Sequence, residues 1–323
     1  MTEVRFAKDQ TEVNQCLKWA KETFHGTPEL EDYKDSLWLD VPHLNLKHLI
    51  VITSDSKLVG FVRVIPTLML MPQGYVRSAC LTSVVILPSA RGKGLSSIMM
   101  NEVMILLKKE GFEFSHLIAR KAVDHFYNKF GFLGLSSYEK IFIKANKMES
   151  GQFSVRPMTN DGLSSCQRFY DLSYSQSFGH VKRDREFWDY SFKRLSLLPG
   201  VGFNGIYSDS ELIGYYIANA SGVLELGIDP SVSNQFLSVL PVENGLITLD
   251  IPYVHVLNSI ISDDMDVSFR SRRCLFGGHM MCDLNHSHLN TLKSLEDHFK
   301  RLGVDIMGMD NSKNFNINFL DQI

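Results

Sequence analysis

The chain has 323 residues, with 33 Lys and Arg against 36 Asp and Glu and a formal net charge of −3. Apolar residues make up 44% and charged residues 21%, a composition typical of globular proteins. The length is enough for two domains of roughly 150 residues each. The small net charge excludes nucleic acid or an anionic membrane surface as a partner held by bulk electrostatics.

The N-terminal segment, MTEVRFAKDQ, lacks the apolar core of a signal peptide. No run of the sequence approaches the ~18 apolar residues that a membrane span needs. We therefore expect a cytoplasmic protein without a membrane-spanning segment. The five cysteines are widely spaced and form no C-x-x-C pair, so we interpret them as reduced, buried thiols.

The first elements are a short strand, a helix and a hairpin. Residues 4–6 predict the strand, and Thr11 is placed to cap the helix that follows. Residues 49–52 and 58–65 flank a Ser-Asp-Ser-Lys turn and predict a hairpin, with nearly continuous apolar residues typical of strands covered on both faces. The apolar connector 67–71 either lines a substrate pocket or packs against the second half, and we favour packing.

The stretch from Leu81 to Met100 combines a β-branched strand, a basic glycine loop at residues 91–94 and an apolar-periodic helix that Gly111 ends. Glycines let the backbone approach a ligand closely, and the free N–H groups and dipole of a helix start favour an anion. A pyrophosphate is the natural occupant. The spacing fits neither the P-loop nor the dinucleotide-binding fingerprint.

Arg91, Gly94 and Ser96 instead match the R/Q-x-x-G-x-G/A motif of the GNAT (GCN5-related) acyltransferases, which this stretch resembles. A second element supports the resemblance, because residues 122–132 are similar to the family helix A-x-x-x-F-Y-E-K-x-G-F beside the pantetheine arm. Ser96 departs from the usual small residue, and Asn128 stands where Glu is common. Both departures concern contacts with the cofactor.

The resemblance implies that acetyl-CoA is the cofactor and cosubstrate. It also implies that Tyr127 is catalytic and protonates the leaving thiolate. The alternative is that Tyr127 is an aromatic residue that only packs. A strand N–H near Val85 would serve the carbonyl oxygen. Strand 78–86 has no Asp or Glu, so a water chain or a groove carboxylate would deprotonate the amine. The residues expected to bind the cofactor come from the strand, the loop, the helix start and the tyrosine helix: Val84, Val85, Ile86, Arg91, Gly92, Lys93, Gly94, Leu95, Ser96, Ser97 and Phe126.

The first unit is expected to end near residue 146. Residues 116–119 predict a strand that, in the resembled fold, splays from its neighbour and admits the thiol end of the cofactor. Residues 139–144 predict the last strand of this unit. A short polar linker follows, so we expect a GNAT acyltransferase domain at residues 1–146 and a second domain at residues 153–323 that packs against it.

The second half repeats the first without its loop. Val155-Arg-Pro echoes Val4-Arg-Phe at an offset of 155 − 4 = 151 residues, and helices and a hairpin follow in the same order. Residues 223–231 align with residues 83–89 but continue as Val-Ser-Asn-Gln in place of the glycine loop. This half resembles a degenerate GNAT unit. The predicted fold is therefore α/β (α+β), with two tandem units, each a mixed, mostly antiparallel sheet flanked by helices, and the second unit is expected to wall the acceptor groove.

A metal site near the end of the chain was the remaining possibility. Cys282, Asp283, His286 and His288 are residue types that bind metals, but no partner completes four ligands at a site-like spacing. We therefore prefer a strand end that runs into a capped helix, and predict no metal.

The predicted function is N-acetyltransfer from acetyl-CoA to a primary amine of a small molecule or a protein, by direct attack. The alternative is a non-catalytic acyl-CoA-sensing or partner-binding tandem GNAT module, because one copy has lost its loop. Some family members are secreted bacterial effectors, so export stays open beside the cytoplasmic location.

Overall fold

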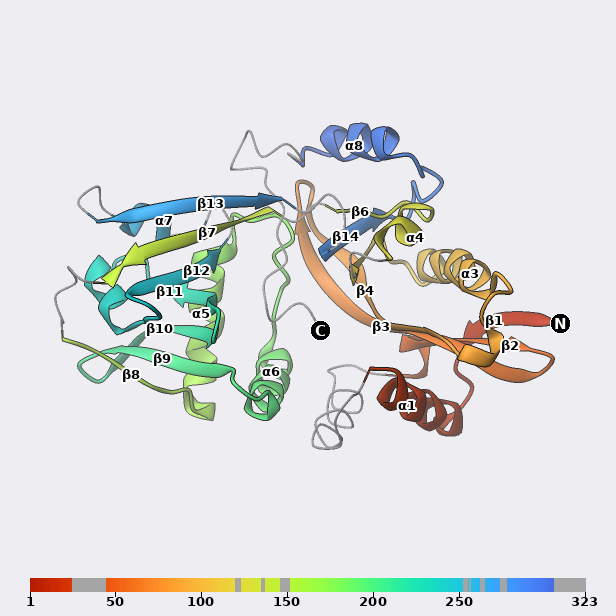
Figure 1. Ribbon diagram of the computed structural model, residues 1–323, viewed down its shortest axis with the longest axis horizontal. Coiled ribbons are helices and arrows are strands. Elements are labelled where there is room, and N and C mark those ends of the chain that lie inside the picture. The colour runs from red at the N-terminus through yellow and green to blue at the C-terminus, as the bar shows by residue number, and fades with distance from the viewer. Residues whose placement is uncertain are drawn as a thin grey trace.

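Two seven-stranded sheets lie next to each other, with helices packed against their faces (Figure 1). The structure is a computed structural model that describes residues 1–24, 45–119, 123–134, 137–145, 152–251, 255, 257–261, 265–273 and 278–304. The first sheet has the order β1-β2-β3-β4-β5-β14-β6, and the second has the order β13-β7-β12-β11-β10-β9-β8. Each mixes one parallel pair with antiparallel pairs, which confirms the predicted α/β fold of two sheet units.

The first sheet is centred on the long hairpin of β3 and β4. Its strands are β1 (Thr2–Phe6), β2 (Leu49–Ser54), β3 (Lys57–Met71), β4 (Gly74–Ile86), β5 (Phe114–Ala119), β6 (Leu133–Gly134) and β14 (Gly278–Asp283). Its α-helices are α1 (Gln10–Phe24), α3 (Leu95–Lys109), α4 (Asp124–Asn128) and α8 (Leu292–Arg301).

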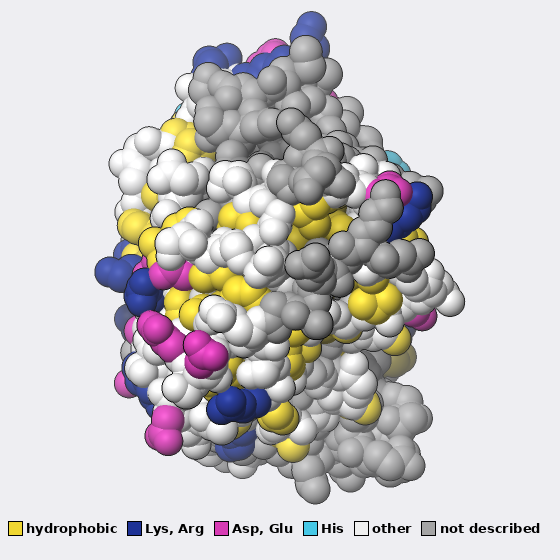
Figure 2. Space-filling view, turned by 90° about the vertical axis from the view of Figure 1, so that its left-hand side faces the viewer, with side chains coloured by type: hydrophobic (Ala, Val, Ile, Leu, Met, Phe, Trp, Pro, Cys, Tyr) yellow, Lys and Arg dark blue, Asp and Glu magenta, His cyan; other side chains and the backbone are white. Residues whose placement is uncertain are grey.

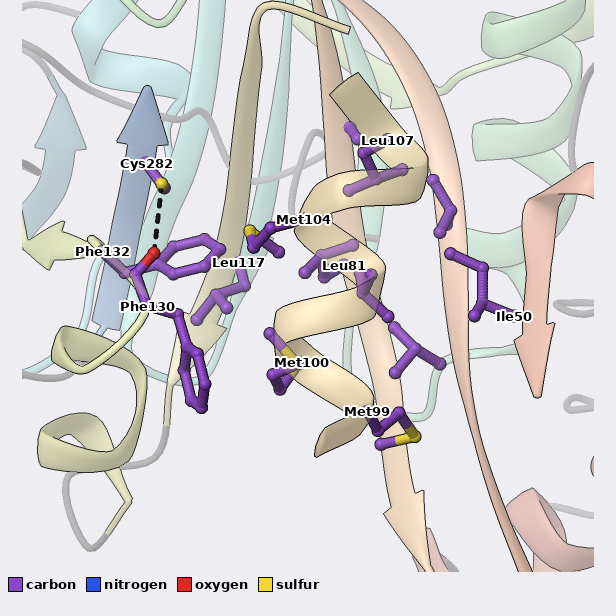
Figure 3. Packing of buried hydrophobic residues seen from close by; sticks show 14 of the residues in the cluster. Ile50, Leu81, Met99, Met100, Met104, Leu107, Leu117, Phe130, Phe132 and Cys282 are labelled. Atoms are coloured by element: carbon purple, nitrogen blue, oxygen red, sulfur yellow. Dashed lines mark hydrogen bonds between the residues drawn. The ribbon is translucent and has the colours of Figure 1, made fainter. Parts of the chain in front are cut away.

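Helices α1 and α3 cover opposite faces of this sheet (Figure 1). Met99, Met100 and Leu107 of α3 are buried against Ile50 and other apolar residues of the strands (Figure 3). On the opposite face, α1 contributes a smaller buried cluster. Both faces of the central strands are therefore apolar, which explains their nearly continuous hydrophobic sequence.

The predicted start of α1 and the predicted end of α3 hold to within two residues. Asp9 rather than Thr11 caps α1, because its Oδ1 accepts the backbone N–H groups of Thr11 and Glu12 at 2.9 and 3.0 Å. Gly111, after the end of α3, has a φ of +78° that L-residues adopt at a cost, so the predicted stop is confirmed.

Strand β3 extends further than the sequence predicts. Its ladder with β4 continues through Pro66 to Met71 instead of ending at residue 65. Near its far end, Leu70 exchanges backbone hydrogen bonds of 2.8 and 2.9 Å with residues 179 and 180 of the second half. The stretch predicted to be a connector is therefore a strand, whereas its predicted packing against the second half is confirmed.

The second sheet has its own buried core. Its strands are β7 (Ser137–Lys144), β8 (Phe153–Pro157), β9 (Gly202–Ser208), β10 (Glu211–Asn219), β11 (Gly222–Ile228), β12 (Leu246–Ile251) and β13 (Val267–Arg273). Its α-helices are α5 (Leu163–Tyr174), α6 (Arg185–Leu197) and α7 (Leu257–Ile260). A six-residue 3-10 helix, Asn234–Val239, stands where the first unit has the fifteen-residue helix α3.

The two sheets exchange a strand. Strand β7 was expected to complete the first unit, but it lies in the second sheet between β12 and β13, where Ile141 and Ile143 are fully buried. In return, β14 lies in the first sheet between β5 and β6. Local sequence predicts a strand without its partner, because pairing depends on distant residues. The predicted domains at residues 1–146 and 153–323 therefore describe the repeat in the sequence, and this division stays a prediction.

Surface charges are mixed on the end of the molecule formed by the second sheet. Figure 2 looks onto that end and shows Lys, Arg, Asp and Glu side chains interspersed with apolar ones. The described part of this face therefore carries no extended patch of a single sign. None of the described helices combines the length and the apolar character that a membrane span requires. The four cysteines with described side chains, Cys16, Cys80, Cys166 and Cys282, are buried and free, as predicted.

The strand exchange predicts how fragments of the chain behave. Residues 1–146 alone should not fold cooperatively, because β5 then loses the six-residue partner β14. A second chain, in which an inserted Asn-Gly connects residues 1–134 to residues 278–304, should fold. Gly134 and Met280 are opposite each other in an antiparallel pair, so a short loop can connect them. Circular dichroism during thermal unfolding compares the two chains. A cooperative transition in the first chain and none in the second would contradict the exchange.

Candidate active site

A cavity of about 620 Å³ opens between β4 and β5, beside the start of α3. This volume is in the range of small-molecule sites. Ten of the predicted site residues line it: Val84, Val85, Ile86, Arg91, Gly92, Gly94, Leu95, Ser96, Phe126 and Tyr127. The other two, Lys93 and Ser97, belong to the same loop and helix start but do not line the cavity. The structure thus brings together two predicted motifs that are about thirty residues apart.

The cavity exists because two parallel strands part. The β4–β5 ladder ends at the pair Leu81–Leu117, although both strands continue beyond it. A bulge in β4 follows, with Ser83 in the left-handed region at a φ of +51°. The edge of β4 past Leu81 therefore faces the cavity instead of β5, as the predicted splay requires.

The exposed edge of β4 offers backbone donors to a ligand. The N–H of Leu87 donates to the carbonyl of Val59 on β3 at 2.9 Å. Because successive N–H groups of a strand alternate in direction, the N–H of Ile86 points to the opposite edge, which borders the cavity. A ligand with amide groups could add itself to this edge as a further strand.

The glycine loop is shaped for close backbone approach. Gly92 and Gly94 have φ values of +77° and +71°, and a Cβ built on either would meet no protein atom within 4 Å. Gly94 is also the N-cap of α3, so the N–H groups of Leu95 and Ser96 are left without intrahelical acceptors, whereas that of Ser97 donates to the Gly94 carbonyl at 3.0 Å. Arg91 is anchored by a 3.1 Å hydrogen bond from its Nε to the carbonyl of Ile86. Loop, helix start and cation together suit a phosphate group.

Tyr127 lines the cavity from the short helix α4. Its ring is half-buried and meets Phe126 and Phe132 edge-on, with centroids 5.2 and 6.0 Å away. Burial raises the pKa of Tyr127 above its ordinary value of 10, so the hydroxyl keeps its proton at neutral pH. Geometry and protonation both fit a proton donor.

The described cavity lining contains no carboxylate and no imidazole. The nearest candidate on the same strands is His116, whose Nδ1 lies 2.8 Å from Ser78 Oγ in a fully buried pair that the sequence analysis did not identify. Burial first, and the neighbouring His279 second, lower the pKa of His116 to about 3. Such a group binds protons too weakly to act as a general base at neutral pH.

The second unit repeats this geometry closely. Gly60 pairs with Ile86 in the first sheet, and Gly214 pairs with Ile228 in the second. Both glycines let the neighbouring strand approach, since a Cβ would lie 2.4 Å from the carbonyl oxygen of Val85 in the first unit and 2.5 Å from the Ile228 side chain in the second. In addition, β11 and β12 form only one parallel pair before they part. The β11 edge is therefore the counterpart of the β4 edge.

In the second unit the chain itself covers this edge. The N–H groups of Leu226 and Ile228 donate to Tyr174 Oη and Ser173 Oγ, each at 3.0 Å. His255 Nε2 lies 2.8 Å from the carbonyl oxygen of Leu226. Tyr174 stands 151 residues after Thr23, which lines the cavity of the first unit. A large side chain on α5 thus takes the place that a small one leaves open on α1.

The two units also contact each other through polar side chains. Arg63 of β3 is 4% exposed and donates a side-chain hydrogen bond to the hydroxyl oxygen of Tyr190 of α6. Burial lowers the pKa of Arg63 to about 10, which leaves it charged at neutral pH. This contact places Tyr190 of α6 beside β3. The role of the second unit as a wall of the acceptor groove stays a prediction.

Comparison with known proteins agrees with this geometry. Residues 3–133 match the family model of an acetyltransferase (GNAT) domain. No curated protein sequence matches the chain.

Solved structures share the two-sheet fold over most of the chain. Eis1 from Mycobacterium abscessus is 17% identical, with a TM-score of 0.61 over 88% of this chain and 74% of that one. A protein from Enterococcus faecalis V583 described as a probable N-acyltransferase is 16% identical, with a TM-score of 0.62 over 89% and 74%. The N-myristoyltransferase of Saccharomyces cerevisiae with bound myristoyl-CoA is 9% identical, with a TM-score of 0.52 over 87% and 82%. Residues 3–133 of this chain thus match an acetyltransferase (GNAT) domain, and the chain shares its two-sheet fold with these solved acyltransferase structures.

Proposed function

We propose that the chain transfers an acetyl group from acetyl-CoA to a primary amine, with the cofactor held in the cavity between β4 and β5. The observation that carries the proposal is the convergence of ten predicted site residues on this one cavity. The amine belongs to a small molecule or to a protein.

The cavity suits acetyl-CoA in three ways. The N–H groups between Arg91 and Ser97 would hold the pyrophosphate, since the loop glycines leave open space where side chains would stand. The N–H groups of Arg91 and Ser97 themselves donate to the carbonyls of Pro88 and Gly94 at 3.3 and 3.0 Å. Lys93 adds positive charge at the rim. The Val84–Ile86 edge of β4 would pair with the amides of the pantetheine arm. The thioester would then lie between the separated strands, near Tyr127.

Tyr127 is proposed as the general acid. Attack of an amine on a thioester builds charge on the carbonyl oxygen and then on the leaving sulfur, and the two charges need different donors. The N–H near Val85 would serve the oxygen. The hydroxyl of Tyr127 would protonate the sulfur, whose thiol has a pKa of about 8.5 and therefore receives a proton readily. A water chain or a carboxylate from the acceptor side would take the proton of the ammonium group.

The second unit is proposed not to bind the cofactor. It lacks the glycine loop, and the hydrogen bonds of Leu226 and Ile228 to Ser173 and Tyr174 are already made within the chain. A pantetheine arm could bind there only by breaking these buried hydrogen bonds.

Replacing Gly94 tests the phosphate loop. Gly94→Val should abolish coenzyme A binding in titration calorimetry, because the side chain would occupy the space proposed for the phosphates and because a φ of +71° strains any L-residue by about 1–2 kcal/mol. The parent chain should bind one coenzyme A.

Gly200→Val is the matched control. Gly200 has a φ of +74° and equally open surroundings, but it lies in the second unit away from the cavity. It should lose similar stability and keep full affinity. Two coenzyme sites in the parent chain, or equal affinity in the two variants, would contradict the assignment.

Tyr127→Phe tests the acid role. The variant keeps the ring, so coenzyme affinity should persist, while turnover with the best acceptor of an amine panel should fall by roughly 10²-fold or more. Release of free thiol measures the rate, and Tyr207→Phe in the second sheet is the control that should leave it unchanged. Turnover within about threefold of the parent, less than ~1 kcal/mol of barrier, would assign the proton to another group. Binding without turnover in the parent chain would favour an acyl-CoA sensor.

A further inference from the structure

Three side chains near the end of the described chain converge on one point. Asp283 Oδ2 lies 3.1 Å from His286 Nδ1 and 3.0 Å from His298 Nε2. The ligand atoms of the three residues all lie within 4.8 Å of one another. Two imidazole nitrogens are thus aimed at a single carboxylate oxygen.

The fold brings these residues together from three elements. Asp283 ends β14, His286 lies in the turn that follows, and His298 is on α8. The sequence analysis considered Asp283 and His286 and predicted a strand end followed by a capped helix, which the structure confirms with Thr291 as the cap. It missed His298, which is fifteen residues after Asp283 and reaches back only because α8 folds over the strand end.

Two of the three residues in the cluster are buried, and the carboxylate is held in place by a backbone hydrogen bond. Asp283 is 7% exposed and His298 is 5% exposed, whereas His286 covers them from the solvent side. The second oxygen of Asp283 accepts the backbone N–H of Asn285 at 2.8 Å, which fixes the carboxylate. Such support of a ligating carboxylate is typical of metal sites.

We propose that Asp283, His286 and His298 bind a zinc ion, with water in the fourth position. In a tetrahedral site with zinc–ligand bonds of roughly 2.1 Å, neighbouring ligand atoms are about 3.4 Å apart. The two observed separations of 3.0 and 3.1 Å need to open by only a few tenths of an ångström. The two imidazoles would bind as neutral ligands and the carboxylate as an anion, so each ring would carry its proton on the nitrogen that does not face the metal.

The ligand set selects the class of metal. Two imidazole nitrogens and one carboxylate oxygen suit zinc and other divalent first-row transition metals, whereas magnesium and calcium prefer oxygen ligands alone. The site would be separate from the proposed transfer chemistry, since none of its residues lines the cavity.

A metal here would fasten the turn after β14 to α8, and this turn also packs on the segment that carries Tyr127. A Cβ on Gly131 would lie 3.0 Å from the α-carbon of Ser287, so this turn packs directly on the chain after α4. Cys282 Sγ also donates to the carbonyl of Phe130 at 3.3 Å (Figure 3). Zinc would thus stabilise the turn that packs behind the Tyr127 helix without contacting the substrate.

Zinc content and thermal unfolding of the full chain test the proposal. After treatment with chelator, the chain should take up one zinc per molecule, and its Tm should rise by roughly a few degrees in excess zinc. His286→Ala should abolish both effects and leave the zinc-free Tm nearly unchanged, because this side chain is about half exposed.

His288→Ala is the matched control, since His288 lies in the same turn with its ring centroid 6.1 Å from that of His286. It should keep one zinc and the Tm rise. The proposal is overturned if the parent chain binds no zinc, because the cluster then only holds the turn to α8 by hydrogen bonds. It is also overturned if the two variants lose zinc equally.

Discussion

When two neighbouring strands of a sheet separate, the backbone N–H and C=O groups on their facing edges lose their partners and need others. Each unit of this chain contains one such place, where two parallel strands separate. In the first unit, β4 separates from β5 after the Leu81–Leu117 pair, and a cavity follows. In the second unit, β11 separates from β12 after a single pair, and side chains of α5 complete the hydrogen bonds of the edge. One unit is therefore left with capacity for a ligand, and the other is closed by its own chain.

The exchange of β7 and β14 makes the two units depend on each other. Each sheet contains a strand that the sequence places with the other half, so neither is complete without both. Further contacts connect the two units: Arg63 with Tyr190, and β3 with residues 179 and 180 through backbone hydrogen bonds. The helix α4, which carries Tyr127, is consequently held in a frame to which residues near 280 contribute, and the proposed zinc site lies at that place.

Local motifs made most of the site predictable. The glycine loop, the start of α3 and Tyr127 each depend on a few adjacent residues whose physical requirements are visible in the sequence. The hairpins and the missing loop of the second half were predictable for the same reason. Long-range features were not: the partner of a strand, the reach of His298 to Asp283, and the filling of the second groove by Tyr174 all depend on residues far apart in the chain.

Backbone amide exchange with and without coenzyme A tests most directly the claim that one edge is open and the other is closed. The account predicts that the amides of Val84 and Ile86 exchange readily in the free chain and become protected when coenzyme A is added. The amides of Leu226 and Ile228 should be protected from the start and should not change, because each donates to a buried side chain at 3.0 Å. Protection of Leu226 and Ile228 that appears only with the cofactor, or no change at Val84 and Ile86, would contradict it.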